Sequence, residues 1–256
     1  MNIPNNQSYY SGTSGLLLPV RNKAFYPDAF KDKSRLNYYA SLFNSIEINS
    51  SFYKMPLAST VAKWANDVPV HFRFTFKFPK AVSHAKLLQY DPAIIPDFFD
   101  RIAQVGHKKG CVLIQFPGSI RLANLPAVVQ LLADVAQCNR THLWPICVEF
   151  RHPEWKAEIT GELLTSSAME LVIHDKLPSG HAINHSSNKV VYLRFHGPNG
   201  NYRGSYPDDL LWEYAEYIKD WMAEGKTVYI YFNNTMGDAI QNLLTLQTAA
   251  LGSPDE

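Results

Sequence analysis

Short runs of β-branched and aromatic residues alternate along this chain with longer runs whose apolar positions recur every three or four residues. The clearest strand pattern is 73–78, where phenylalanines alternate with polar residues. The clearest helical pattern is 210–223, where Leu211, Ile218 and Trp221 share one face. The same criteria predict strands at 9–13, 45–49, 73–78, 111–116, 146–150, 171–174, 190–196 and 226–232. Helices are predicted at 36–43, 60–66, 96–106, 126–136, 162–167, 210–223 and 238–251.

The strict alternation of strands and helices determines the predicted fold class. Strands separated by helical crossovers form a parallel sheet, and eight such units close as a barrel of about 250 residues. We therefore predict an α/β protein in which residues 1–256 form a single (β/α)8 TIM-type barrel. The alternative is an open doubly wound sheet, which usually carries a G-x-G-x-x-G turn; this chain has none.

Composition narrows the classes of partner. The chain has 46% hydrophobic and 18% charged residues, as a folded globule requires. Its formal charge of +1 gives no general field for nucleic acid, so such binding would need a local basic patch. No apolar run approaches the ~20 residues of a membrane span, so no membrane partner is expected. The polar first ten residues and three cysteines without metal spacing indicate a cytoplasmic protein with reduced thiols; no oligomeric state is indicated.

Polar residues gather on one face of the predicted strands. Successive strand side chains point to opposite faces, and the more apolar face of each strand must pack against the helices. The other face looks into the barrel and is polar near the carboxyl ends of the strands, where barrel enzymes bind their substrates. The residues predicted to meet there are Glu47, Asn49, Lys77, Gln115, Glu149, Arg151, Arg194, His196 and Asn233. The alternative is that these charged side chains pair only with one another, fill the end of the barrel and bind no ligand.

Two carboxylates in this set suggest acid–base chemistry. Glu47 and Glu149 come from different strands and could act as a pair in a hydrolase, lyase or isomerase, with His84 or His196 as the partner acid. Tyr53 is a further candidate acid. The competing interpretation is that the glutamates only neutralise neighbouring cations.

Three cations in the same set favour a small anionic ligand. Lys77, Arg151 and Arg194 suit a phosphate, a carboxylate or a sugar acid, because arginine binds such groups with two parallel hydrogen bonds. A non-catalytic ligand-binding barrel would use the same residues. Nucleic acid bound along a groove of lysines and tyrosines is not favoured, because the overall charge is near neutral.

A divalent metal is a further alternative, as in apurinic-endonuclease-type phosphodiesterases or sugar-isomerase-type barrels. The candidate ligands are Glu47, His84, Glu149, Asp175 and His196. None has a diagnostic spacing, and nearby cations would repel a metal ion, so the sequence does not require one.

Several sequence motifs at the strand ends are similar to those of a known family. They are Gly12-Thr13-Ser14-Gly15, 43–53, Ser83-His84, Gln115-Phe116-Pro117, 149–155, Asp175, 192–197, Tyr202 and 229–234. Together they resemble the YecE-like family, also called domain of unknown function 72, over nearly the whole chain. The resemblance implies a TIM barrel without a settled biochemical function. Leu16 and Thr235 depart from the family pattern, where an aromatic and an acidic residue are common.

The family motifs and the inward-facing strand positions indicate the same candidate site. The expected catalytic residues are Glu47, Glu149, His196 and His84. The expected substrate-binding residues are Asn49, Tyr53, Lys77, Gln115, Arg151, Asp175, Arg194, Tyr202 and Asn233.

Overall fold

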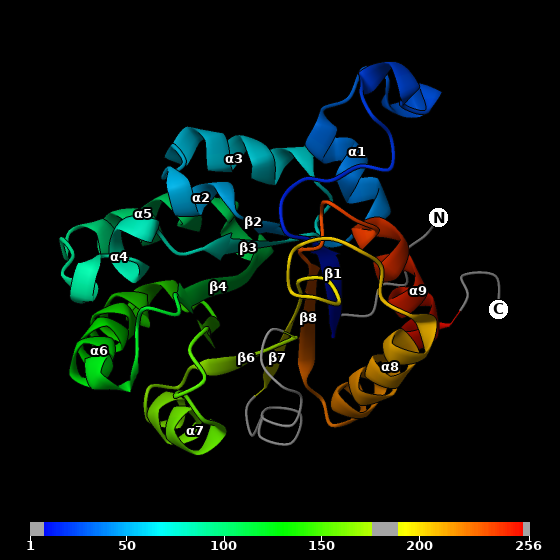
Figure 1. The fold of residues 1–256 in the computed structure, drawn as a ribbon. Helices are drawn as coiled ribbons and strands as arrows, with labels where there is room; N and C mark the ends of the chain where they lie inside the picture. The colour runs from blue at the N-terminus through cyan, green and yellow to red at the C-terminus, as the bar shows by residue number, and fades with distance from the viewer. Residues whose placement is uncertain (1–7, 176–188, 253–256) are drawn as a thin grey trace.

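A computed structural model describes residues 8–175 and 189–252 of the chain. Parallel strands form one eight-stranded sheet in the order β1-β8-β7-β6-β5-β4-β3-β2, with helices outside them (Figure 1). The strands are β1 (Tyr9–Thr13), β2 (Ser45–Ile48), β3 (Arg73–Lys77), β4 (Lys109–Phe116), β5 (Ile146–Phe150), β6 (Glu170–His174), β7 (Val190–Phe195) and β8 (Thr227–Phe232). Because each strand lies beside its neighbour in sequence and β1 pairs with β8, the sheet curves into a nearly closed (β/α)8 barrel, which confirms the predicted fold class.

The helices follow the predicted order with some changed bounds. They are α1 (Arg35–Leu42), α2 (Ser50–Tyr53), α3 (Ala58–Asp67), α4 (Lys80–Ser83), α5 (Ile94–Ile102), α6 (Leu125–His142), α7 (Ala157–Ser166), α8 (Asp208–Ala223) and α9 (Ala239–Leu251). The short α2 and α4 were not predicted. The α6 helix continues six residues past its predicted end, and near its observed end Asn139 exchanges two hydrogen bonds with the backbone of Trp144. Within the described residues no helix is long and apolar enough to cross a membrane.

The barrel has two separate apolar cores, which confirm the predicted strand faces. Phe74 and Phe76 are fully buried against the helix layer. The opposite strand faces form an inner core of Tyr10, Cys111, Leu113, Cys147, Val172, Tyr192, Tyr229 and Tyr231. The Tyr231 side chain reaches across this interior from β8 to β2 and β3. Its hydroxyl forms hydrogen bonds with Thr75 Oγ1 at 2.8 Å and Ser45 Oγ at 2.6 Å. The barrel is therefore a packed core, and the polar residues lie above it.

Both side chains and a short stretch of backbone join β1 to β2 where the barrel closes. Ser14, directly after β1, forms a parallel bridge with Glu47, and the Gly15 backbone nitrogen donates to the Glu47 carbonyl at 2.8 Å. Asn44 accepts a hydrogen bond from the Ser11 backbone nitrogen and donates one to the Tyr9 carbonyl, both at 2.8 Å. At Gly12 a Cβ atom would lie 2.0 Å from the Ser45 carbonyl oxygen. Glycine therefore allows the two strands to approach closely, and Asn44 satisfies the backbone groups of β1 that would otherwise be unpaired.

Replacing Asn44 with alanine is expected to lower the free energy of unfolding by about 2 kcal/mol, because it leaves a buried donor and a buried acceptor unsatisfied. The measurement is the urea unfolding midpoint of Asn44→Ala beside that of Asn66→Ala, an exposed asparagine on α3. Equal unfolding midpoints for the two variants would show that Asn44 does not stabilise the junction between β1 and β2.

Candidate functional site

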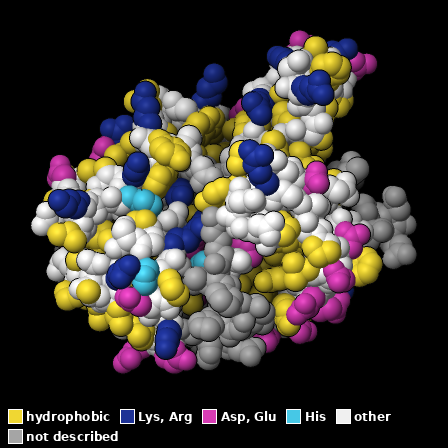
Figure 2. Space-filling view, viewed as in Figure 1, with side chains coloured by type: hydrophobic (Ala, Val, Ile, Leu, Met, Phe, Trp, Pro, Cys, Tyr) yellow, Lys and Arg dark blue, Asp and Glu magenta, His cyan; other side chains and the backbone are white. Residues whose placement is uncertain are grey.

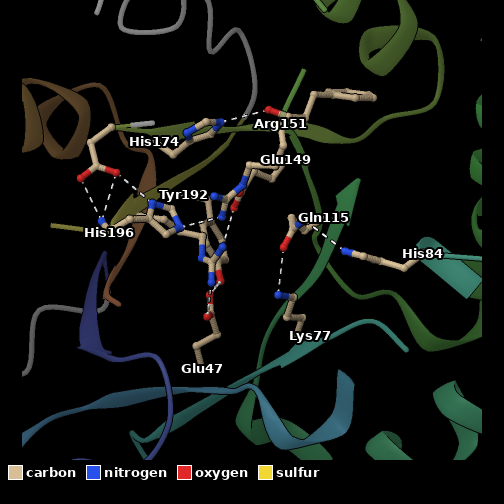
Figure 3. A network of polar contacts seen from close by, with 12 residues as sticks. Glu47, Lys77, His84, Gln115, Glu149, Arg151, His174, Tyr192 and His196 are labelled. Atoms are coloured by element: carbon tan, nitrogen blue, oxygen red, sulfur yellow. Dashed lines mark hydrogen bonds and ion pairs between the residues drawn. The ribbon is translucent and has the colours of Figure 1, made fainter. Parts of the chain in front are cut away.

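The predicted polar residues form two networks at the carboxyl ends of the strands (Figure 3). The arginine network consists of Glu47, Glu149, Arg151, Asp175, Arg194 and His196. The lysine network consists of Lys77, Ser83, His84 and Gln115. Strand parity places most of these side chains together, because they occupy inward positions near the ends of their strands.

Arg194 is the centre of the arginine network. Its Nη2 donates to Glu47 Oε1 at 2.7 Å and its Nη1 donates to Glu149 Oε2 at 2.6 Å. All three side chains have no exposed surface. The second oxygen of Glu47 accepts the Tyr192 hydroxyl at 2.5 Å. Both carboxylates are thus held by groups inside the barrel.

The network continues outward from Glu149. Its Oε1 forms an ion pair with Arg151 Nε. Arg151 Nη2 lies 2.8 Å from His196 Nε2, and His196 Nδ1 lies 2.8 Å from Asp175 Oδ1. A guanidinium can only donate, so His196 Nε2 is the acceptor and Nδ1 carries the proton toward Asp175. This direction of hydrogen bonds fixes the neutral Nδ1–H tautomer of His196.

Burial and ion pairing together determine the charges here. Burial would raise the pKa of Glu47 and Glu149, but Arg194, together with Tyr192 at Glu47 and Arg151 at Glu149, outweighs burial and holds both pKa values below the usual range. Burial lowers the pKa of His196 to about 4, although its hydrogen bond to Asp175 opposes the shift. At neutral pH both glutamates are charged and His196 is neutral.

Lys77, at the end of β3, makes a different kind of contact. Its Nζ donates to Gln115 Oε1 at 3.0 Å and lies 4.3 Å from the centre of the Phe52 ring. Among residues 8–175 and 189–252 no carboxylate lies within ion-pair distance of Lys77. Burial, and after it the charge of Arg194, lowers the pKa of Lys77 to about 8. Lys77 is therefore a half-buried cation without a direct ion-pair partner among the described residues, although Glu47 and Glu149 oppose the shift of its pKa from a distance.

A pocket of about 460 Å³ adjoins the lysine network. Phe52 and Tyr53 of α2 line it together with Lys80 of α4 and His84. Burial lowers the pKa of His84 to about 4, with Lys77 as the next cause. Figure 2 shows a hollow near the middle of this face, in which basic and histidine side chains gather. The one-turn helices missed by sequence analysis thus form a wall of the candidate site.

The remaining predicted residues border these networks. Tyr53 is 77% exposed in the pocket wall. Asn49 precedes α2, and its buried Oδ1 has no hydrogen-bond partner in the described part of the chain. The Tyr202 ring lies 5.9 Å from that of His196. Asn233 is half-buried, and its backbone nitrogen donates to Phe195.

Three expected roles need correction. Direct binding of a ligand by Arg194 does not fit its geometry, because it has no exposed surface and both Nη atoms are bound to carboxylates. Glu47 and Glu149 are equally enclosed, so they do not face a substrate as an open acid–base pair. Sequence analysis gave no role in this network to Tyr192, which shares its strand face with Arg194, or to Tyr206, whose hydroxyl binds Asp175.

The metal alternative gains no support from the geometry. Among the described residues no group of three or more His, Cys, Asp and Glu side chains is arranged to hold a metal ion. The oxygens of Glu47 and Glu149 that would bind a metal are held by arginine and tyrosine donors instead.

Acidification is expected to destabilise the protein through His196. Its folded pKa of about 4 lies below the ordinary value of about 6.5, so the unfolded chain binds the proton first as pH falls. Stability should therefore drop between pH 6.5 and 4, with His196 contributing about 2–3 kcal/mol by pH 4.5. Urea unfolding of the wild type and His196→Asn across this range measures that share. A pH slope unchanged by the substitution would contradict the assignment.

Comparison with known proteins agrees with the fold. The family model "Protein of unknown function DUF72" matches residues 10–254. The Escherichia coli K12 protein YecE is 30% identical over 124 residues, which are 48% of this chain and 43% of YecE, so the matched region spans less than half of that relative. The Bacillus subtilis protein YunF is 22% identical over 86% of this chain and 87% of its own length.

A solved structure of a DUF72 family protein from Thermotoga maritima is similar to the whole barrel. It has 26% sequence identity and a TM-score of 0.76, with 94% of this chain and 98% of the other covered. The match of the family model to almost the entire chain places the protein in the family: this barrel belongs to the proteins of unknown function DUF72.

Proposed function

We propose that this barrel is an enzyme that binds a small anionic substrate, bearing a phosphate or a carboxylate, at Lys77 and Arg151. The observation that supports this most strongly is Lys77, a half-buried cation with a neutral amide as its hydrogen-bond partner and a lowered pKa. A bound anion would give Lys77 the direct ion-pair partner that it lacks among the described residues.

Arg151 is the second expected contact. Its side chain is 13% exposed, and Glu149 and His196 hold its Nε and Nη2. Within the described residues its Nη1 makes no hydrogen bond, so both N–H groups of Nη1 remain for a ligand. The buried members of the arginine network would then position Arg151 rather than contact the substrate. With its Nε and Nη2 bound to Glu149 and His196, the guanidinium has a fixed orientation and presents Nη1 to the ligand.

The test is a thermal-shift series with sulfate, sugar phosphates and sugar acids against neutral sugars. We expect anions to raise the melting temperature of the wild type, since a ligand that binds only the folded state stabilises it by mass action. Lys63→Met, an exposed lysine on α3, should retain the shift and Lys77→Met should lose it. An equal anion shift in both variants would contradict the proposal.

Other functions predict other outcomes of the same series. A groove for nucleic acid would give DNA binding with a steep salt dependence and no selective response to small anions. A non-catalytic binding barrel would give the anion shift without turnover of any phosphorylated sugar or sugar acid. Turnover that depends on Lys77 would identify the enzyme as a hydrolase, lyase or isomerase by its product.

A further inference from the structure

We propose that Lys77 is a covalent nucleophile, whose amine forms an imine with the carbonyl group of an anionic substrate such as a keto acid or a phosphorylated ketose. This proposal rests on the proposed anion site and adds a substrate class and a chemical step to it. The evidence is the arrangement of the lysine network and the position of Lys77 in the barrel.

The hydrogen-bond partner of Lys77 allows the neutral amine. Gln115 Oε1 accepts a hydrogen bond from Lys77 Nζ at 3.0 Å, and an amine can donate that bond as well as an ammonium can. A carboxylate in the same place would favour the ammonium by direct attraction. With one N–H directed to Gln115, the lone pair of the neutral amine is left for attack on a carbonyl carbon.

The far side of Gln115 fixes its orientation. The Gln115 Nε2 amide lies 3.4 Å from His84 Nε2, and His84 Nδ1 lies 3.0 Å from Ser83 Oγ. Since the amide nitrogen can only donate, His84 Nε2 is an acceptor and the ring is neutral with its proton on Nδ1. Gln115 is therefore a positioning residue, which turns its oxygen toward Lys77.

The charged surroundings of Lys77 also favour the neutral amine. Burial is the main cause that lowers the pKa of Lys77 to about 8, and the arginines at 194 and 151 lower it as well. Glu47 and Glu149 oppose this shift, but Arg194 already binds both carboxylates. About half of Lys77 is then neutral at pH 8, where an ordinary lysine with a pKa of about 10.4 is almost wholly protonated.

The step is balanced by the loss of one water molecule. The amine lone pair forms a C–N bond to the carbonyl carbon, and the π electrons of the C=O bond move to oxygen. The nitrogen gives up its two protons, the oxygen takes two and leaves as water, and a C=N bond remains. We assign the transfer of a proton between nitrogen and oxygen to His84, which is neutral and belongs to the same network through Gln115.

The pocket and Arg151 match the two ends of such a substrate. Arg151 would hold its phosphate or carboxylate. The pocket beside Phe52 and His84 has room for the rest of the carbon skeleton, and Lys77 Nζ lies 4.3 Å from the centre of the Phe52 ring that lines it.

The test is reductive trapping with sodium borohydride in the presence of pyruvate or dihydroxyacetone phosphate, followed by peptide mass mapping. We expect the wild type and Lys63→Arg to be labelled at Lys77, and Lys77→Arg to carry no label there or elsewhere above background. The labelling rate in the wild type should rise with pH and level off above pH 8, whereas a surface lysine continues to gain reactivity beyond pH 10. Sulfate should compete with labelling by dihydroxyacetone phosphate.

The outcomes separate this proposal from the one on which it rests. Absence of label at Lys77 with both probes, together with a Lys77-dependent anion shift, would overturn the imine and leave the anion site standing. Absence of both label and shift would remove both proposals. Label spread evenly over Lys63 and other surface lysines, or a rate at Lys77 that has not levelled off by pH 10, would also overturn the imine.

Discussion

Replacing Arg194 with methionine is expected to lower the free energy of unfolding by about 3–5 kcal/mol, the largest stability effect that we predict for a single substitution. Arg194 is the shared partner of Glu47 and Glu149, and none of the three side chains has exposed surface. Without the guanidinium Glu47 loses its ion-pair partner inside the barrel, and Glu149 keeps only its ion pair with Arg151. Removing one partner of a buried ion pair costs far more than the pair contributes.

Urea unfolding of Arg194→Met measures this loss, with Arg21→Met as the matched change at an exposed site. Adding Glu47→Gln to Arg194→Met removes the uncompensated charge and should restore part of the stability. A loss no larger than that of Arg21→Met would show that the arginine network is not what balances charge in the barrel.

Sulfate affinity is expected to fall by up to about 100-fold between pH 7 and pH 10. Lys77, with a pKa of about 8 in the free protein, is mostly an ammonium at pH 7 and mostly a neutral amine at pH 10. Binding an anion to the amine form lacks the ion pair, so binding must take up a proton at high pH. Sulfate itself does not titrate over this range, which leaves the change to the protein.

Titration calorimetry of the wild type and Lys77→Arg checks this dependence. The arginine variant keeps a cation at every pH in the range, because its guanidinium does not deprotonate, and should bind sulfate with little change up to pH 10. Wild-type affinity that is constant to pH 10, or an equal decline in Lys77→Arg, would contradict the role of Lys77.

The location of the candidate site could be predicted from the sequence because the side-chain period of a strand is two. Once the phenylalanines of 73–78 are assigned to the helix layer, Lys77 must point into the barrel, and the same argument applies to Glu149 and Arg194. The strand bounds were predicted to within about two residues, since each strand is a distinct β-rich run.

The pairing of the charges could not be predicted in the same way. Parity gives the direction of a side chain but not its depth along the barrel, and depth decides which charge reaches solvent. Arg194 lies within β7 and is buried, whereas Arg151 follows the end of β5 and is partly exposed. The one-turn helices α2 and α4 were missed because four residues are too few to show a period of 3.6.

A crystal structure of the protein soaked in sulfate tests the central claim most directly, namely that the mouth of the barrel binds anions through Lys77 above a charge-balanced buried network. We predict a sulfate ion within hydrogen-bond distance of Lys77 Nζ and Arg151, with Arg194 still paired to Glu47 and Glu149. A structure in which Lys77 forms an ion pair with Glu47 or Glu149, or in which a saturating sulfate concentration leaves Lys77 without an anion, would contradict it.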